Sequence, residues 1–214
     1  MRRVYPVVKR GADIRLSVIA LILLSPVFIL VFLAVRLDSP GPALFCQKRA
    51  GRNGTYFTIY KFRTMRMDAP SNMPTHLLKD SSRCITRVGS FLRKSSLDEI
   101  PQLINILLGQ MSLIGPRPAL WNQYDLIEAR HACGVDAVRP GLTGWAQVHG
   151  RDELSIPQKV ALDRYYVQHL GLSIDIRSLL MTVGVVSTAK GVVEGEQEKY
   201  AEEEARSMAD GGKQ

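Results

Sequence analysis

An apolar run at residues 16–35 contains no charged side chain and constrains the fold of this chain more than any other feature. Its twenty residues would rise about 30 Å as a straight helix, which is the thickness of the hydrocarbon core of a bilayer. Ser25 and Pro26 lie in the middle of the run. A proline there removes a backbone hydrogen bond and kinks the helix, and a serine hydroxyl can bind the freed carbonyl. The sequence therefore predicts a broken membrane helix.

Basic residues lie on both sides of this run, among them Arg10 and Arg15 before it and Arg36 and Lys48 after it. Because positively charged flanks tend to stay in the cytoplasm, we expect residues 1–37 to form a re-entrant helix hairpin that enters and leaves by one face. An uncleaved signal anchor that crosses once is the alternative. A cleaved signal peptide is not favoured, because the run is long and no small-residue cleavage site follows it.

The net charge of +8 is unevenly distributed, since residues 194–214 carry seven acidic and three basic side chains. A basic body of this kind is typical of proteins that bind nucleic acid, anionic lipid or a phosphate-bearing substrate. We expect one cytoplasmic domain at residues 38–193, followed by an acidic mobile tail at 194–214. Three widely separated cysteines favour neither a zinc site nor a disulfide framework and fit a reducing compartment.

Two adjacent carboxylates, Asp98 and Glu99, stand at the start of an apolar stripe with helical spacing. Ser96 with Glu99 matches a capping box, and Pro101 is tolerable in a first helical turn. The pattern therefore predicts that both carboxylates lie at a helix N-terminus, where the macrodipole and the nearby Arg93 favour their ionised forms. An ionised carboxylate held in place suits a nucleophile or a metal ligand. The alternative is that both are simply favourable first-turn residues.

The residues around the carboxylates carry further cations. Residues 44–49 and 56–63 predict a β-hairpin, and strand alternation puts Lys61 and Arg63 at the end of its apolar face. These cations could hold phosphate oxygens or could belong to a solvated strand end. Residues 82–94 predict a short amphipathic helix that brings Arg93 toward the carboxylates.

Two later segments also suggest ligand binding. Arg117 lies between two prolines, which restrict its backbone and favour a fixed guanidinium suited to phosphate. Residues 139–151 contain three glycines, two arginines and a tryptophan, which indicates a loop whose backbone can approach a ligand closely. Residues 172–193 form an amphipathic run that could pack on the body or lie on a membrane surface.

Five motifs follow one another in order: Ser25-Pro26 within the apolar run, and then residues 60–65, 96–103, 111–118 and 139–145. In this combination the chain resembles the bacterial sugar transferase family of small monotopic phosphoglycosyl transferases, over about residues 2–193. The resemblance implies a helix-rich α+β fold with a small β-hairpin and an N-terminal re-entrant membrane helix. It also implies a location at the cytoplasmic face of the bacterial inner membrane.

Members of this family move a sugar 1-phosphate from a UDP-sugar to polyprenyl phosphate and release UMP, the first membrane step of glycoconjugate synthesis. The resemblance implies that Asp98 attacks the β-phosphorus to form an aspartyl-phosphosugar intermediate, and that Glu99 and Asp98 help to hold Mg²⁺. It further implies several binding roles: Lys61, Arg93 and Arg117 as phosphate ligands, Arg139 and Gly141 as a nucleotide or diphosphate contact, and Asp175 as a further metal neighbour.

The sequence leaves the sugar open, although residues 117–123 resemble family members that use acetamido-6-deoxy sugars. It leaves the oligomeric state open as well, a homodimer included. A non-catalytic membrane scaffold that binds anionic lipid is the main alternative function. A phosphohydrolase is not favoured because its usual Asp-x-Asp pattern is missing, and a nucleic-acid binder is not favoured because no recognisable module is present.

Overall fold

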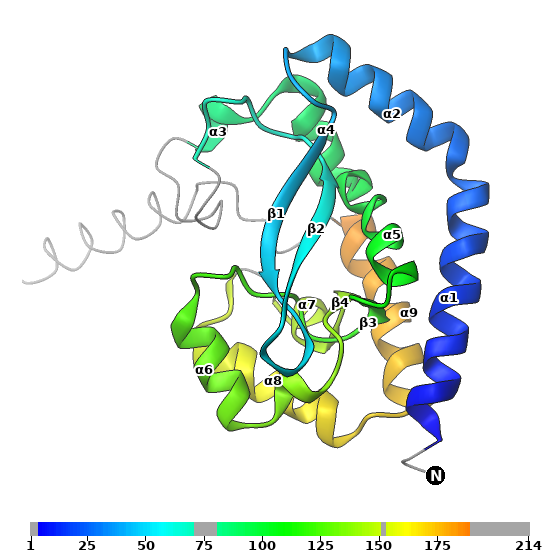
Figure 1. Ribbon diagram of the computed structural model, residues 1–214, viewed down its shortest axis with the longest axis vertical. Helices are drawn as coiled ribbons and strands as arrows, with labels where there is room; N and C mark the ends of the chain where they lie inside the picture. Colours follow the sequence, from blue (N-terminus) through cyan, green and yellow to red (C-terminus); the bar gives the residue numbers. More distant parts are fainter. Residues whose placement is uncertain (1–3, 71–80, 151–152, 189–214) are drawn as a thin grey trace, which may run out of the picture.

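The computed structural model describes residues 4–70, 81–150 and 153–188 (Figure 1). The predicted acidic tail at residues 194–214 lies outside the described residues. Within them the chain forms an α+β fold in which helices surround two small sheets of two strands each. The predicted helix-rich α+β class is therefore confirmed.

Helices α1 (Tyr5–Leu23) and α2 (Ser25–Asp38) form an arc along one side of the molecule (Figure 1). The two axes are bent by 63°, and the Ser25 hydroxyl donates to the carbonyl of Ile22 at 2.8 Å. The break predicted at Ser25 and Pro26 is confirmed, as a wide bend instead of a tight hairpin. Among the described helices none is long and apolar enough to cross a membrane alone, whereas this pair together has the length and composition of a span.

Strands β1 (Leu44–Ala50) and β2 (Tyr56–Phe62) form the predicted antiparallel hairpin. A single 3₁₀ turn, η1 (Arg52–Gly54), joins them. Phe57 and Ile59 of β2 are buried, and Lys61 follows on the same face. The hairpin is therefore anchored in the hydrophobic core by Phe57 and Ile59, and this fixes Lys61 beside the carboxylates.

The segment after the hairpin differs from the single helix predicted for residues 82–94. It forms α3 (Ser81–Cys84) and α4 (Arg87–Ser95), separated by a β-bridge between Ile85 and Met65. At Gly89 a Cβ atom would lie 2.0 Å from the carbonyl oxygen of Thr64, so only glycine allows α4 to approach the chain this closely.

The prediction of a capping box at Ser96 is wrong. Ser96 adopts the left-handed conformation, with φ at 56°, and ends α4. The two carboxylates then lie on a 3₁₀ turn, η3 (Leu97–Glu99), and α5 (Gln102–Leu107) begins only after Pro101. Because a left-handed residue breaks the helix, Asp98 and Glu99 lie between two helices, and the macrodipole argument for their ionisation no longer applies.

The rest of the described chain contains a parallel strand pair, β3 (Ser112–Ile114) and β4 (Gly141–Thr143). Around this pair lie α6 (Tyr124–Ala132), η4 (Val135–Ala137), α7 (Trp145–Val148), α8 (Ile156–Gln168) and α9 (Leu172–Thr188). The loop predicted for residues 139–151 is therefore partly a strand and partly a short helix.

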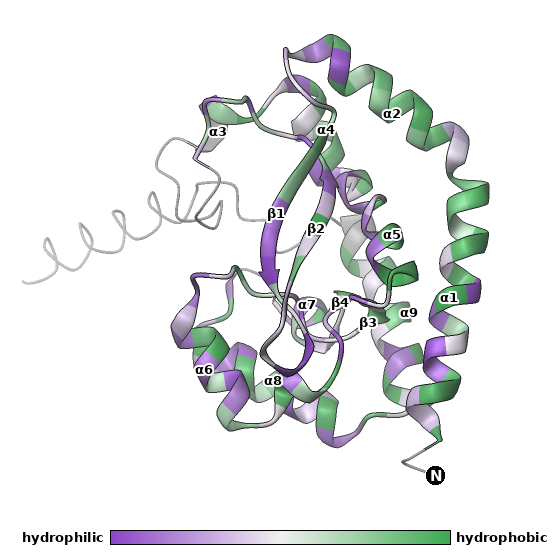
Figure 2. Ribbon diagram, viewed as in Figure 1, coloured by the Kyte–Doolittle hydropathy of each residue, from purple (hydrophilic) through white to green (hydrophobic). Residues whose placement is uncertain are grey.

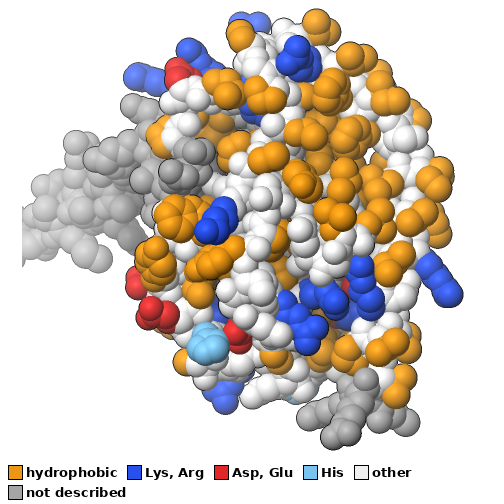
Figure 3. Space-filling model, in the orientation of Figure 1, with side chains coloured by type: hydrophobic (Ala, Val, Ile, Leu, Met, Phe, Trp, Pro, Cys, Tyr) orange, Lys and Arg blue, Asp and Glu red, His pale blue; other side chains and the backbone are white. Residues whose placement is uncertain are grey.

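The largest hydrophobic core joins the arc to the body of the protein. It contains Val31 and Val35 of α2, Ile59 and Phe62 of β2, and Ile106 of α5. Other apolar side chains of α1, α2 and α9 remain exposed. Figure 2 shows α2 and the upper half of α1 as predominantly hydrophobic, and Figure 3 shows hydrophobic side chains covering this side of the molecule. The arc therefore packs on the core with one face and presents apolar residues outward with the other.

Candidate active site

The carboxylates of Asp98 and Glu99 lie between α4, α5 and β2. Asp98 is only 9% exposed, and the side chain of Glu99 is 12% exposed. Burying an ionised carboxylate is costly unless cations and hydrogen bonds compensate for the lost water. The partners of these two residues therefore determine their chemistry.

Glu99 binds two cations through one oxygen. Its Oε1 atom accepts from Lys61 Nζ at 2.7 Å and from Arg117 Nη2 at 2.9 Å. Lys61 Nζ is also 3.9 Å from Oδ2 of Asp98, a distance too long for a hydrogen bond. Glu99 thus fixes both cations next to Asp98 while leaving the carboxylate of Asp98 weakly paired.

The surroundings shift the pKa values of the two carboxyl groups in opposite directions. Burial raises the pKa of Asp98, and the neighbouring charge of Glu99 raises it further, against the opposing effect of Lys61. Burial acts on Glu99 in the same direction, but Arg117 and Lys61 outweigh it and hold the pKa of Glu99 well below its usual range. The prediction that the surroundings favour ionisation of both carboxylates is therefore correct for Glu99 and wrong for Asp98.

Lys61 is positioned by a buried asparagine, Asn105, which the sequence did not suggest as a site residue. The side chain of Asn105 on α5 accepts from the backbone N–H of Tyr60 at 3.0 Å and donates to the carbonyl of Thr58 at 2.7 Å. It is fully buried, and the two bonds tie β2 to α5, the helix that follows the dyad of Asp98 and Glu99. A polar residue within the apolar stripe of this helix was the available signal.

A buried ion pair between Arg130 and Asp163, which the sequence did not suggest, holds the backbone of Arg117. Arg130 of α6 donates to the Asp163 carboxylate of α8 through Nε at 2.9 Å and Nη2 at 2.6 Å. Its third nitrogen donates to the backbone carbonyl of Arg117 at 2.7 Å. Together with the two flanking prolines, this contact restricts the backbone from which the Arg117 guanidinium reaches Glu99.

Arg93 completes the basic surroundings from α4. Its Nε donates to the hydroxyl of Thr64 at 2.9 Å, and its charge is close enough to Asp98 to lower the pKa of that carboxyl. The structure therefore brings together five of the predicted site residues, Asp98, Glu99, Lys61, Arg93 and Arg117. Arg63 is placed elsewhere, because its guanidinium binds Ser39 and the carbonyl of Pro42.

Two other predicted residues, Arg139 and Gly141, have contacts away from the dyad. Arg139 donates to the carbonyl of Gly109 at 2.8 Å, just beyond the C-terminal end of α5. A Cβ atom on Gly141 would lie 2.1 Å from the backbone nitrogen of Gly115, so the packing of β3 on β4 already requires this glycine. Their predicted contact with a nucleotide or diphosphate stays a prediction.

Asp175 holds α1 against α9. Its carboxylate accepts from the Tyr5 hydroxyl and from Lys9 Nζ, each at 2.6 Å, and from the Tyr166 hydroxyl at 2.8 Å. Among the described residues no group of three or more His, Cys, Asp or Glu side chains is placed to hold a metal ion. The carboxylate of Asp175 is thus engaged with the N-terminal helix and α8, and its predicted role as a metal neighbour stays a prediction.

A weakly paired buried carboxylate beside three fixed cations defines a site suited to a phosphorylated substrate, on a fold with an apolar outer arc. The bacterial sugar transferase family model matches residues 4–189. The chain belongs to this family, as its motifs suggested.

Several relatives carry names that describe an activity. The chain is 38% identical over 192 residues to the undecaprenyl-phosphate glucose phosphotransferase of Komagataeibacter xylinus, which covers 82% of this chain and 35% of that protein. It is 38% identical over 196 residues to a UDP-N-acetylgalactosamine-undecaprenyl-phosphate N-acetylgalactosaminephosphotransferase of Aeromonas hydrophila, covering 88% of this chain and 45% of the relative. A third relative, the uncharacterized sugar transferase EpsL of Bacillus subtilis (strain 168), is 38% identical over 186 residues, covering 87% of this chain and 90% of its own length. The chain thus spans less than half of the first two relatives and most of the third.

Proposed function

We propose that this protein transfers a sugar 1-phosphate from a UDP-sugar to polyprenyl phosphate and releases UMP. The proposal rests on the different ion pairing of the two carboxylates. Glu99 binds Lys61 and Arg117, whereas Asp98 remains weakly paired. A nucleophile must be free to form a new bond, and the cations beside it must stay in place for the phosphates. Names of relatives that describe undecaprenyl-phosphate sugar phosphotransferases support the same reaction class.

The proposed chemistry has two steps. A carboxylate oxygen of Asp98 attacks the β-phosphorus of the UDP-sugar, and the bond between that phosphorus and the bridging oxygen breaks, so that UMP leaves with the bridging oxygen. A phosphate oxygen of polyprenyl phosphate then attacks the same phosphorus. The bond to Asp98 breaks, which restores the carboxylate and yields the polyprenyl-diphospho-sugar.

The cations address an electrostatic difficulty in the first step, because an anionic carboxylate must approach an anionic diphosphate. Two like charges 4 Å apart repel by about 4 kcal/mol at an effective dielectric constant near 20. Lys61, Arg93 and Arg117 offset this repulsion, and Lys61 and Arg117 cost little to reorganise because Glu99 already fixes them.

The dyad also fits Mg²⁺, which commonly binds one or two carboxylates and completes its coordination with substrate phosphates and water. Both ion pairs of Glu99 use Oε1, so Oε2 of Glu99 and the carboxylate of Asp98 are the oxygens that would hold the ion. When bound, Mg²⁺ would neutralise charge on the diphosphate. Because the described residues supply no third carboxylate beside the dyad, the substrate would provide the remaining oxygen ligands.

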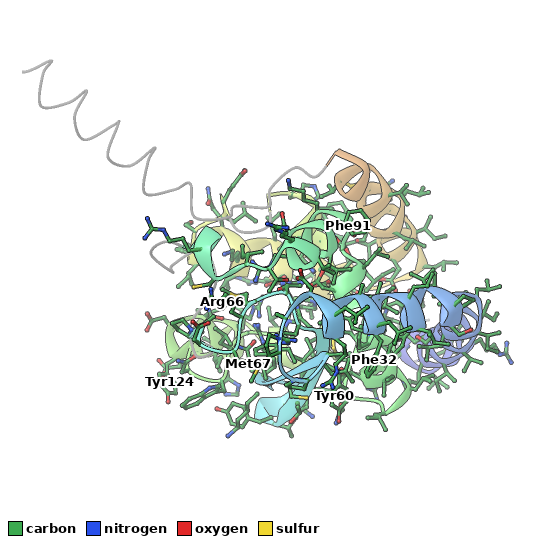
Figure 4. All side chains as sticks on the ribbon, turned by 90° about the horizontal axis from the view of Figure 1, so that it is seen from above. Phe32, Tyr60, Arg66, Met67, Phe91 and Tyr124 are labelled. Carbon is green, nitrogen blue, oxygen red and sulfur yellow. The ribbon has the colours of Figure 1, made fainter. Side chains whose placement is uncertain are left out.

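The apolar arc suits the second substrate, a lipid whose phosphate stays at the membrane surface. Exposed apolar residues lie along α1, α2 and α9, and Phe32 of α2 and Phe91 of α4, both labelled in Figure 4, are also exposed. We propose that this surface enters the cytoplasmic leaflet of the inner membrane from one side, as a re-entrant helix with flanking amphipathic helices.

Intact-protein mass spectrometry tests the function directly. The full chain in nanodiscs would be incubated with Mg²⁺ and a panel of UDP-sugars that includes UDP-glucose, UDP-N-acetylgalactosamine and a UDP-acetamido-6-deoxyhexose, without polyprenyl phosphate. We expect one sugar-phosphate adduct per chain with about equal UMP, absent in Asp98→Asn, and transfer of the adduct when polyprenyl phosphate is added.

Two other outcomes would change the proposal. UMP release that requires polyprenyl phosphate, with no adduct, would retain the transferase but remove Asp98 as the nucleophile. No UMP release from any sugar in the panel, together with binding to anionic vesicles, would favour the membrane scaffold instead.

A further inference from the structure

A pocket of about 400 Å³ is lined in part by Arg117, and none of the functions above uses it. It lies between the turn end of the β-hairpin, the segment at residues 116–119 and the pair α6 and η4. In Figure 1 this end of the hairpin lies near α6 and α8, away from the upper arc formed by α2 and the end of α1. Its volume is within the usual range for pockets that bind small molecules.

Arg117 connects the pocket to the catalytic carboxylates. Arg117 is one of the residues that line the pocket, and its Nη2 atom donates to Oε1 of Glu99 at 2.9 Å. A ligand in the pocket with a phosphate on Arg117 would therefore extend toward Asp98. In a UDP-sugar whose β-phosphorus is at Asp98, either the uridine or the sugar could occupy this pocket.

The chemistry of the walls distinguishes the two halves. Most of the wall is apolar, including Pro116, Pro118, Ala119, Val135 and Val138. A hexose buried there would leave several hydroxyl groups without partners, each at a cost of about 1–3 kcal/mol. A uracil ring has two flat faces that pack on apolar surfaces and only one polar edge. The wall therefore favours the base.

The polar groups of the pocket are few. Besides Arg117 they include Glu128, Arg130, His131 and Asp136. Arg130 is paired with Asp163, and the exposed His131 is paired with Asp136 at 2.8 Å. Tyr56 contributes a half-exposed aromatic ring from the hairpin side. This combination of apolar walls, one aromatic ring and a few polar side chains suits a base with its ribose directed toward solvent.

We propose that this pocket binds the uridine of the donor, so that Arg117 lies between the nucleoside pocket and the reacting phosphorus. The inference rests on the proposed transferase function and adds to it the path by which the soluble substrate enters. The polyprenyl chain is a poor candidate for this pocket, because the exposed apolar residues of α1, α2 and α9 lie elsewhere.

A substitution that fills the pocket tests the proposal. Ala132 lines the pocket and is exposed at the end of α6, so Ala132→Trp adds an indole there without disturbing the core. Ala161→Trp is the matched control, since Ala161 is also an exposed helical alanine, on α8, and is not part of the pocket wall. Tyr56→Ala tests the opposite wall by removing a ring instead of adding one.

Three quantities would be measured for each variant in nanodiscs. These are the dissociation constant of UMP in the Asp98→Asn background, the KM for UDP-sugar in adduct formation, and the KM for polyprenyl phosphate with adduct formed beforehand. We expect Ala132→Trp to weaken UMP binding and raise the donor KM at least tenfold, and Tyr56→Ala to do so about threefold. Ala161→Trp should leave all three quantities within twofold of the parent protein, and the polyprenyl phosphate KM should not change in any variant.

The outcomes separate this inference from the proposed function. If the parent protein forms the adduct but Ala132→Trp leaves UMP affinity and donor KM within twofold, the uridine binds elsewhere and the transferase function stands. A rise in the polyprenyl phosphate KM alone would assign the pocket to the lipid and overturn the inference. If the parent protein neither binds UMP nor releases it from any donor, both proposals fail.

Discussion

Neutralising Glu99 should destabilise the fold, whereas neutralising Asp98 should not. Asp98→Asn and Glu99→Gln each replace a carboxylate by an amide of the same shape, on adjacent residues of one 3₁₀ turn. The two changes remove the same charge from nearly the same place. Any difference between them therefore reports the partners of each group.

Glu99→Gln leaves two cations without their counterion. The Lys61 side chain is 16% exposed, and removing one partner of a buried ion pair typically costs about 3–5 kcal/mol. Two features reduce that figure here. The Arg117 side chain is 38% exposed and can be solvated, and Asp98, 3.9 Å from Lys61, can take over part of the pairing. We expect a net loss of about 2 kcal/mol.

Asp98→Asn should not destabilise the fold. Burial and the charge of Glu99 raise the pKa of Asp98, so the folded state binds a proton there more tightly than the unfolded state does. The ionised carboxylate is therefore a destabilising group, and a neutral amide removes that cost. We expect an unchanged stability or a gain of up to about 1 kcal/mol, as is common when an active-site charge is removed.

Thermal unfolding of the two variants and the parent protein in one detergent would measure the difference. For a chain of this size 1 kcal/mol shifts the midpoint by about 2–4 °C. Glu99→Gln should therefore unfold about 4–8 °C below the parent protein, while Asp98→Asn unfolds at or above the parent. The advantage of Asp98→Asn should shrink as the pH falls through the raised pKa of Asp98, because protonation then neutralises the parent carboxylate as well. Equal losses in both variants would refute the reasoning.

Three further predictions concern the same site and its supports. Without Mg²⁺, protonation of the Asp98 carboxylate, followed by infrared difference spectroscopy against Asp98→Asn, should occur at a pH above about 4, where an ordinary aspartate titrates, because burial and the charge of Glu99 raise its pKa; protonation at or below that pH would contradict this. Asp175→Asn should lower the unfolding midpoint by about 4–8 °C, because it weakens the ion pair with Lys9. It should leave the Mg²⁺ dependence of adduct formation unchanged, and a changed dependence would show that Asp175 acts near the metal. Asn105→Leu should cost about 2–3 kcal/mol in the same thermal assay, because the N–H of Tyr60 and the carbonyl of Thr58 lose their partner; a loss below about 0.5 kcal/mol, the usual scale of surface substitutions, would show that water replaces it.

The features that the sequence predicted correctly depend on local chemistry. The hairpin follows from alternation and a glycine-containing turn at residues 51–54, and the bend in the arc follows from Ser25 and Pro26. The cations around the dyad were predicted from their positions in short motifs that also occur in the family. These signals are contained in short stretches, so they can be read without knowing how the chain packs.

The errors occurred where tertiary contacts override a local pattern. Ser96 with Glu99 has the spacing of a capping box, yet Glu99 instead binds Lys61 and Arg117, which come from distant parts of the chain. Ser96 then takes a left-handed conformation and ends the preceding helix. The roles of Asn105 and Asp175 were equally hidden, because each depends on partners that are far away in sequence.

The different pairing of Asp98 and Glu99 allows the cations to stay in place through both steps of the proposed reaction. A two-step transfer brings a soluble donor and a lipid acceptor to the same carboxylate at different times, so the cations must remain in place after UMP leaves. Glu99 binds Lys61 and Arg117 without using the oxygen atoms of Asp98, and the contact of Arg130 with the carbonyl of Arg117 does not depend on a substrate. The cationic site is therefore held by the protein itself, and Asp98 can form and break its bond to phosphorus in both steps without dismantling it.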